Sequence, residues 1–328
     1  MDAFSEVLSG VHLNGAMFFS AEFSAPWRVF TPEFRTLAPA LAPDARHLVI
    51  YHLVVDGDAR AQLADGPAIA LAAGDIVVFP HGNPHYLSAG TGAGDVESAR
   101  VLEKIVNRDL SPMRSGGGGP KTKFVCGYLS LDPLLCGPIL ESLPSMLTVN
   151  VRSDAAGHWL EQSILHLVNE AASDRAGSDA MLAKLSEALF VDTLRRYVAS
   201  LPDQTTGWLA GARDVVVGKS LALLHRRASH AWTIAELAAE VGVSRSALVA
   251  RFGRYLADSP MAYLTGWRLR MAAQALTSSP KSVADIAAAV GYESEAAFNR
   301  AFKRQFGVPP ARFRRQSRES RPDERAKL

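Results

Sequence analysis

The sequence predicts an α+β protein in which a β-rich N-terminal domain is followed by an all-α C-terminal domain. Short apolar runs at 48–55 and 76–79 alternate with turn clusters such as DGDA and HGNP, a pattern typical of a sandwich or small barrel. Helical periodicity begins near His158, and one helix pair occurs twice in the last third of the chain. The length of 328 residues fits two domains of ordinary size.

Composition excludes several classes of protein. Hydrophobic residues make up 48% of the chain and charged residues 21%, as in ordinary globular proteins. Two cysteines exclude a disulfide framework and fit a reducing compartment. No apolar run reaches the roughly 18 residues of a membrane helix, and the N-terminus carries acids where a secretory signal carries basic residues. We therefore expect a cytoplasmic protein with no membrane partner.

The net charge of +2 conceals an uneven distribution along the chain. Residues 215–328 hold 19 Lys and Arg against 9 Asp and Glu, a net charge of +10. Residues 1–214 hold 16 basic against 24 acidic residues, a net charge of −8. A basic third joined to an acidic remainder predicts one module that faces a polyanion such as nucleic acid and another with a different task.

The β-rich domain is predicted to span 1–150, and a helical pair is predicted to follow over 151–207. The glycine run 116–119 is interpreted as a loop between strands, because the lysine or hydroxyl and the helix of a phosphate-binding loop are missing. Apolar residues at helical spacing mark one helix between 159 and 168 and another between 181 and 194. This pair either closes the core of the β-rich domain or pairs with a second copy of the chain, so a homodimer through 178–200 is one expectation. The polar stretch 202–211 is predicted to be the connector between domains.

The most specific signal is an internal repeat, because residues 233–252 align with residues 282–302. Each copy opens with a hydroxyl cap, Thr233 or Ser282, before a short alanine-rich helix. A glycine, Gly242 or Gly291, then ends that helix just before a second one. This layout is the helix-turn-helix pattern, and two copies in the basic region are far more specific than one.

The two copies are joined by a long predicted helix over 260–280. It starts at Pro260 and stops before Pro280. A rigid spacer fixes the distance between two recognition helices, and successive major grooves on one face of DNA lie about 34 Å apart. One chain can therefore read two adjacent grooves. An all-helical module that binds protein is the alternative, and the charge of this segment favours DNA.

The basic C-terminal third resembles a known protein family. Residues 208–316 are similar to the DNA-binding domain of the AraC/XylS family of bacterial transcription regulators, and the second repeat, GYESEAAFNRAFKRQFGVPPARFRR, carries that family's signature. The resemblance implies a double helix-turn-helix domain that binds double-stranded DNA, with RNA polymerase as a further partner. The basic and polar tail 317–328 is predicted to be disordered.

The resemblance also implies which side chains face the groove. The first recognition helix would present Arg245, Ser246, Val249 and Ala250, and the second would present Glu295, Ala296, Asn299 and Arg300. Arg300 can pair with guanine, Asn299 with adenine, and Glu295 can accept from cytosine, whereas Val249 and Ala250 cannot hydrogen-bond to a base. Phosphate attraction is expected from Arg251, Lys303 and Arg304, with simple surface solubility as the alternative for Arg251.

The N-terminal domain resembles a cupin, a small β-barrel. The stretch GDIVVFPHGNPH at 74–85 has the spacing of the second cupin motif, although its final asparagine is replaced by Ala89. The first motif should supply two histidines and a glutamate, but only His52 is present and Val54 replaces the second histidine. We therefore expect no metal, and a pocket for a small-molecule effector instead. The residues expected to contact the effector are His52, His85, Tyr86 and Trp27, with core filling as the alternative for each and the favoured role for Trp27.

The sequence thus predicts an effector-controlled DNA-binding regulator that is not an enzyme and holds no cofactor. The alternative is a metal-dependent cupin enzyme fused to a DNA-targeting module, against which the missing histidine argues. A purely architectural DNA binder would need no sensor domain. Cys126 and Cys136 form either a redox switch or inert buried thiols, and the sequence leaves both open.

Overall fold

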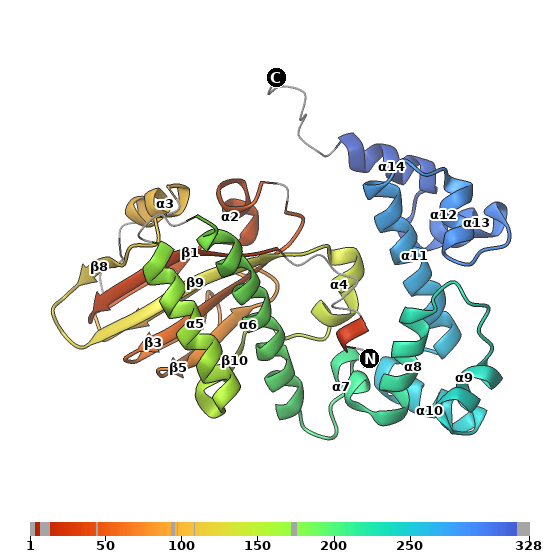
Figure 1. Cartoon of the computed structure of the whole chain (residues 1–328), viewed down its shortest axis with the longest axis horizontal. Helices are drawn as coiled ribbons and strands as arrows, with labels where there is room; N and C mark the ends of the chain where they lie inside the picture. The colour runs from red at the N-terminus through yellow and green to blue at the C-terminus, as the bar shows by residue number, and fades with distance from the viewer. Residues whose placement is uncertain are drawn as a thin grey trace. The chain divides into compact units, whose positions relative to one another are not determined.

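A computed structural model of the chain describes residues 4–6, 14–43, 45–92, 96, 98–107, 109–171 and 176–319. Its strands lie within the first 150 residues and its last third is helical, so the predicted α+β class is confirmed (Figure 1). Contacts divide the chain into two units. The sheet unit consists of His12–Asp132 and Leu143–Ser200, and the helical unit consists of Met1–Val11, Pro133–Ser142 and Leu201–Leu328.

The larger sheet of the sheet unit has six strands in the order β10-β6-β3-β9-β1-β8. Only β1 and β8 pair in parallel, and the other neighbours are antiparallel. The predicted runs 48–55 and 76–79 become β3 and β6, and the glycine run 116–119 connects β8 to β9 as expected. The strands are β1 (Asn14–Ser24), β3 (Leu48–Asp56), β6 (Asp75–Phe79), β8 (Met113–Gly116), β9 (Lys121–Ser130) and β10 (Leu147–Asn150).

The second sheet has four antiparallel strands in the order β2-β7-β4-β5. Its strands are β2 (Trp27–Thr31), β4 (Ala59–Leu63), β5 (Ala68–Leu71) and β7 (His85–Ala89). Side chains of both sheets, such as Phe23 and Phe124 from one and Trp27 from the other, share one apolar core. Within the described residues no ladder joins the edges of the two sheets, so the cupin-like domain is a pair of facing sheets and not a closed barrel.

The predicted helical pair belongs to the sheet unit as α5 (Ala155–Ala171) and α6 (Ser178–Ser200), and α6 packs on β1. A tyrosine attaches α6 to the sheet, because the Tyr51 hydroxyl donates to Ser186 Oγ at 2.8 Å. Gly127, opposite Tyr51 on β9, makes room for that ring, since a Cβ there would lie 2.0 Å from the hydroxyl. The helix pair therefore closes the core of its own domain. Two further helices, α2 (Phe34–Leu41) and α3 (Ser98–Val106), complete the unit.

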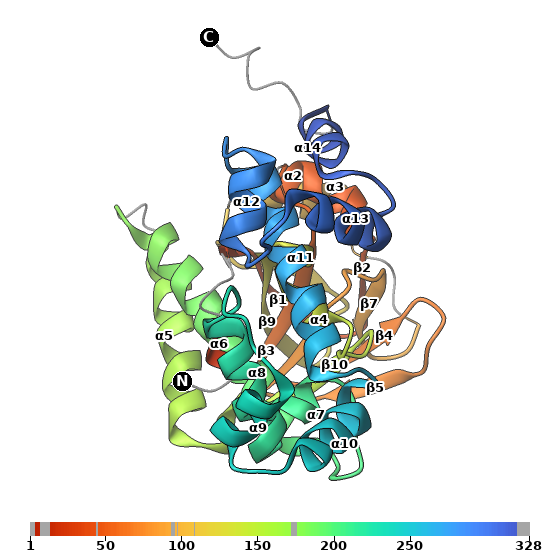
Figure 2. The ribbon, with the colours of Figure 1, turned by 90° about the vertical axis from the view of Figure 1, so that its right-hand side faces the viewer.

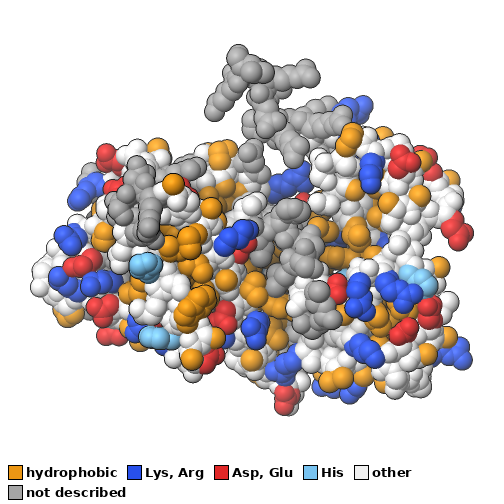
Figure 3. Space-filling view, viewed as in Figure 1, with side chains coloured by type: hydrophobic (Ala, Val, Ile, Leu, Met, Phe, Trp, Pro, Cys, Tyr) orange, Lys and Arg blue, Asp and Glu red, His pale blue; other side chains and the backbone are white. Residues whose placement is uncertain are grey.

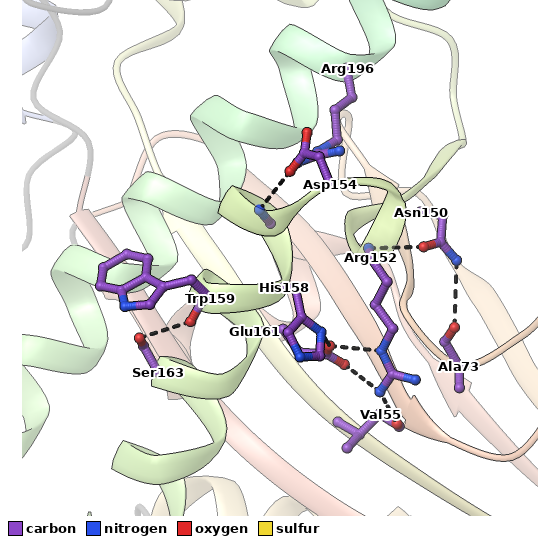
Figure 4. A network of polar contacts seen from close by, with 11 residues as sticks. Val55, Ala73, Asn150, Arg152, Asp154, His158, Trp159, Glu161, Ser163 and Arg196 are labelled. Atoms are coloured by element: carbon purple, nitrogen blue, oxygen red, sulfur yellow. Dashed lines mark hydrogen bonds and ion pairs between the residues drawn. The ribbon is translucent and has the colours of Figure 1, made fainter.

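A network of polar contacts holds the start of α5 beside the sheet (Figure 4). The Glu161 carboxylate is fully buried and accepts two hydrogen bonds from Arg152, from Nε at 2.7 Å and from Nη2 at 2.8 Å. Arg152 lies in η1 (Val151–Ser153), and its Nη2 also donates to the Val55 carbonyl at 2.7 Å. On α6, Arg196 donates to Asp154 at 2.8 Å. These contacts fix the start of α5 to the sheet and join α6 to the segment that precedes α5.

The helical unit contains the predicted repeat (Figure 2). Its helices are α4 (Pro133–Leu140), α7 (Trp208–Arg213), α8 (Val215–Arg226), α9 (Ile234–Val241), α10 (Arg245–Leu256), α11 (Pro260–Ser278), α12 (Val283–Ala289), α13 (Glu295–Phe306) and α14 (Pro310–Glu319). The connector is shorter than the predicted 202–211, because α7 already begins at Trp208. The tail predicted for 317–328 starts inside α14, and residues 320–328 lie outside the described part.

The helical unit has an unexpected member, α4, which comes from between β9 and β10 in the sequence. Leu134 packs against the core of α11 to α13, and Arg270 of α11 lies 3.7 Å from Glu141. Ser142 Oγ accepts a hydrogen bond from the backbone N–H of Trp208 at 2.9 Å, at the start of α7. None of the described helices is long and apolar enough to cross a membrane.

Candidate nucleic-acid interface and sensor core

The first helix-turn-helix module, α9 and α10, forms as its capping residues predict. Thr233 Oγ1 accepts a hydrogen bond from the Glu236 N–H at 3.1 Å, which caps α9. Gly242 ends that helix in the left-handed region with a φ of 76°. Ser244 then caps α10, and Leu248 and Phe252 are its buried residues. Local sequence therefore sets where both helices begin and end.

The second module, α12 and α13, repeats this arrangement with a fuller cap. Ser282 and Asp285 bond reciprocally as a capping box at the start of α12. Ser294 caps α13, which buries Phe298 and Phe302. Between the modules, α11 starts with Pro260 in its first turn and ends at Ser278, as the sequence predicts.

The residues predicted to face DNA lie on the outer faces of α10 and α13. All but one of them are exposed, and Asn299 is half-buried. Val249, the largest apolar member of the set, is 38% exposed. In Figure 3, several Lys and Arg side chains lie over α8 to α10. The structure thus presents two cap-defined helices whose outer faces carry the predicted set.

Two arginines of the basic segment have structural contacts of their own. Arg251 Nη2 lies 3.9 Å from Asp214, whose carboxylate caps α8 by accepting from the N–H groups of Val216 and Val217. Arg314 donates to the carbonyl oxygens of Leu276 and Lys281 at the end of α11. These two arginines therefore contribute to the fold of the helical unit.

In the sheet unit, the side chains of His52, His85 and Cys126 form one buried chain of hydrogen bonds. His52 Nε2 lies 2.7 Å from His85 Nε2, and His52 Nδ1 lies 2.6 Å from Cys126 Sγ. At the far end, His85 Nδ1 lies 2.7 Å from the Asn83 carbonyl oxygen. His52 and Cys126 are paired residues of β3 and β9, whereas His85 comes from β7 of the other sheet. The cluster therefore links the two sheets across the core.

The chain has a direction, which fixes the proton positions. A carbonyl only accepts, so His85 Nδ1 donates to Asn83 and neutral His85 accepts at Nε2. His52 consequently donates from Nε2 and accepts at Nδ1 from the Cys126 thiol. Burial disfavours charge on every member: it lowers the pKa of His85 to about 4, lowers the pKa of His52 well below its usual value, and raises the pKa of Cys126. The cluster is a neutral, closed network.

This network makes stability depend on pH. Because the pKa of His85 falls from its ordinary 6.5 to about 4 in the folded chain, the unfolded chain binds more protons in that window. The contribution of neutral His85 to the free energy of unfolding is complete above pH 6.5 and is lost progressively as the pH falls toward 4. We expect the titration of His85 to lower the free energy of unfolding in urea by about 2 kcal/mol when the pH falls from about 7.5 to about 5. His85→Gln should remove this part of the pH dependence and leave the part due to His52 and His225, whose pKa values burial also lowers. Equal pH dependence in both proteins would contradict the assignment to His85.

The other two residues expected at an effector site lie elsewhere. Tyr86 is adjacent to His85 in β7 and therefore faces the opposite side, where the Arg28 guanidinium lies 3.8 Å from its ring centre. Trp27 is 1% exposed and stacks on Phe124 with 5.4 Å between ring centres. Within the described residues, buried Trp27 Nε1 and Asn83 Oδ1 have no hydrogen-bond partner. The structure brings His52 and His85 together but does not bring Tyr86 to them.

The histidine cluster is a poor match to the metal site of a cupin. His52 directs opposite ring nitrogens toward His85 and Cys126, so the three groups do not converge on one point. The two imidazole nitrogens are only 2.7 Å apart, whereas two ligands at about 2.0–2.1 Å from a tetrahedral zinc lie more than 3 Å apart. In the described part of the chain, no group of three or more His, Cys, Asp or Glu is arranged to hold a metal ion.

The two cysteines belong to different units. Cys126 lies in β9 of the sheet unit and Cys136 in α4 of the helical unit, and both are buried without a disulfide. A thiolate is the reactive form, and burial holds the pKa of Cys126 above its usual value. The geometry favours an inert thiol at Cys126. Nothing local in the sequence places Cys126 beside His52, because only the register of β3 and β9 brings them together.

Comparisons with known proteins agree with both halves of this picture. A family model described as a cupin matches residues 2–199, and one described as a helix-turn-helix domain matches residues 237–316. The HTH-type transcriptional regulator AlkR of Acinetobacter baylyi is 28% identical over 97% of this chain and 100% of its own length. A putative AraC-like transcription regulator of Streptomyces lividans is 31% identical over 83% of this chain and 88% of its own. The solved DNA-binding domain of AdpA in complex with a target DNA is 28% identical, covering 34% of this chain and 98% of that one, with a TM-score of 0.32.

Proposed function

The chain belongs to the AraC family of transcription regulators, and we propose that it reads two adjacent major grooves of one operator under the control of a small molecule bound by the sheet unit. The observation that carries the first part is the pair of capped helix-turn-helix modules on one spacer, α11, with exposed outer faces. Because such a regulator acts on the chromosome, we expect it in the cytoplasm.

The two recognition helices are proposed to read DNA differently. On α13, Arg300 pairs with guanine, Asn299 with adenine and Glu295 with cytosine through hydrogen bonds in the major groove. On α10, Val249 and Ala250 contact thymine methyl groups or follow groove shape. Lys303 and Arg304 attract phosphate without regard to sequence. The operator should therefore have one strictly conserved half and one more tolerant half.

Arg300→Ala tests direct readout by α13. Loss of a bidentate contact to guanine should weaken binding to the selected operator about 5- to 150-fold, corresponding to about 1–3 kcal/mol, and weaken binding to unrelated DNA much less. The measurement is a pair of titrations at one salt concentration, on DNA selected from random sequences and on unrelated DNA. Lys303→Ala is the matched control, because a phosphate contact should weaken both by a similar factor. Parallel losses for Arg300→Ala would rule out direct readout.

Effector control is proposed for the core between the two sheets. Two buried polar atoms, Trp27 Nε1 in this core and Asn83 Oδ1 in the loop between β6 and β7, lack a partner within the described residues. Such groups favour a bound water or polar ligand. The cupin family of this domain also supports a ligand-binding role. The test is repeated DNA selection with candidate metabolites. A metabolite that changes operator affinity in the intact chain but not in Asn83→Leu would support the location.

We propose that the chain is not an enzyme, since its relatives are named as transcription regulators. The alternative, a metal-dependent cupin enzyme fused to a DNA-targeting module, needs ligands that converge, and His52 and His85 instead hydrogen-bond to each other. Metal analysis of the purified protein discriminates between the two. A stoichiometric metal that is lost in His52→Gln would favour the enzyme.

A homodimer and a contact with RNA polymerase complete the proposal. The buried side of α6, which includes Leu182, Leu189 and Leu194, packs within its own unit, so a dimer would use the outer sides of α5 and α6. Large apolar side chains are exposed there, Trp159 by 65% and Met181 by 57%, and Figure 3 shows hydrophobic side chains on this face. Light scattering of the intact chain tests the dimer, and Trp159→Glu should yield monomers.

A further inference from the structure

A spacer helix sets the distance between two modules, but it does not set their rotation. Short segments link α11 to its neighbours, at 257–259 before it and 279–282 after it. If only these links held the modules, each module could turn about its own link. Reading two grooves on one face of DNA requires a fixed rotation as well as a fixed distance. Side-chain contacts must therefore hold the modules. The second module shares an apolar core with α11, so the contacts that join the first module to this pair set the remaining rotation.

The side chain of Arg268, in the middle of α11, makes such a contact. Its Nε donates to the Ala228 carbonyl at 2.6 Å and its Nη2 to the His230 carbonyl at 2.7 Å. Both acceptors lie in the loop between α8 and α9, which leads directly into the first module. The planar guanidinium donates in two fixed directions, so it holds this loop in one orientation relative to α11.

The second module reaches the same loop through its turn glycine. Gly291 follows α12 and has a φ of 85°. A Cβ at Gly291 would lie 2.5 Å from the Ser229 carbonyl oxygen and 3.0 Å from Arg268 Nη2. The absence of a side chain therefore lets the turn of the second module lie directly against the loop that Arg268 holds. One short loop meets α11 and both modules.

The loop itself is rigid enough to transmit this constraint. Trp232 Nε1 donates to the Arg227 carbonyl at 3.2 Å, and the Arg227 guanidinium lies 4.7 Å from the centre of the Trp232 ring. The backbone N–H of His230 also donates to the Arg227 carbonyl, at 3.1 Å. His230 Nε2 lies 2.7 Å from Glu236, in the first turn of α9. The loop is thus fastened to the start of the first module.

We propose that Arg268 and Gly291 are positioning residues that lock the two helix-turn-helix modules in one relative rotation, so that the protein accepts a single spacing between the two halves of its operator. This inference rests on the proposed reading of two grooves. Neither residue touches DNA in this proposal. Their effect is on which DNA the two recognition helices can occupy together.

The experiment uses the full chain and three duplexes derived from DNA selected on the unaltered protein. One duplex has both half-sites, one has only the second half-site, and one has two base pairs inserted between the half-sites. In the unaltered chain the insertion should cost about 30-fold or more in affinity, because it rotates one half-site by roughly 70°. Arg268→Met should bind the single half-site with unchanged affinity and the two-half-site duplex about 10-fold more weakly. The insertion should then lower the affinity of this variant by less than about threefold.

Three further variants make the result decisive. Gly291→Ala should behave like Arg268→Met, because its Cβ pushes the turn away from Ser229. Arg268→Lys keeps the charge but cannot donate in two fixed directions. Its loss of affinity on insertion should therefore lie between those of the unaltered chain and of Arg268→Met. Arg270→Gln removes a cation from the same helix without touching the loop, and it should keep the full insertion penalty.

Two outcomes would overturn the inference. An undiminished insertion penalty in Arg268→Met would show that other contacts fix the rotation. An equal loss on the single half-site would show that Arg268 only stabilises a module. If selection on the unaltered chain yields one half-site alone, the proposed reading of two grooves fails first, and the rotation lock falls with it.

Discussion

Arg152→Met is expected to destabilise the sheet unit by about 3–5 kcal/mol, because it leaves a buried carboxylate without its partner. Glu161 is fully buried, and both of its short hydrogen bonds come from Arg152. The imidazole of His158 gives no comparable contact, because its Nδ1 is 3.9 Å from Glu161 on a side chain that is 58% exposed. Urea unfolding of the intact chain, with hydrogen exchange of the α5 amides to assign the transition to this unit, measures the loss.

The double variant Arg152→Met/Glu161→Met is the matched control. Replacing both members of a buried ion pair by apolar groups is often nearly neutral, so the double variant should recover most of the lost stability. A loss of less than about 1 kcal/mol in the single variant would mean that the pair behaves like an exposed one. An unrecovered loss in the double variant would assign the effect to the bond from Arg152 to the Val55 carbonyl.

Phe298→Ala should unfold the second module while the sheet unit stays folded. Phe298 is fully buried, and its ring centre lies 5.3 Å from that of Tyr292 and 5.5 Å from that of Phe302. Truncating a buried phenylalanine costs about 3–5 kcal/mol, a large part of what a small helical module holds. Binding to the two-half-site operator should be lost, and hydrogen exchange of the α12 and α13 amides should rise.

Phe306→Ala is the control for that variant, since its side chain is only half-buried. It removes the same atoms, but from the edge of that core, so its effect on stability should be clearly smaller. Comparable losses in both variants would mean that exposure does not govern the energetics of this core. An operator affinity that survives in Phe298→Ala would show that the first module binds without the second.

Helix boundaries were predictable because they depend on residues close together in the chain. Thr233, Ser244, Ser282 and Ser294 each cap the helix that follows by accepting from an N–H three residues later. That spacing is visible in the sequence. The internal repeat then indicated the two-module arrangement, which capping alone does not specify.

Contacts between distant strands were not predictable. Cys126 meets His52 only because β9 pairs with β3 in one register, and the two residues are 74 positions apart. The segment that became α4 is apolar without a clear stripe, so nothing local indicates which core it joins. The orientation of Tyr86, by contrast, follows from the sequence. Side chains alternate between the two faces of a strand, so the residue after the inward-facing His85 faces away from it.

The membership of α4 in the helical unit means that the two units are interwoven along the chain. The chain passes from one unit to the other at 132–133, returns at 142–143 and crosses again at 200–201. A protease that cuts within 201–207 would therefore leave α4 covalently joined to the sheet unit, and only noncovalent packing would hold it to the rest of the helical unit. A C-terminal fragment that starts at Leu201 would lack Leu134 and would expose part of the core that α4 covers. Exchange of sensor domains between related regulators must carry this internal segment along with the DNA-binding half.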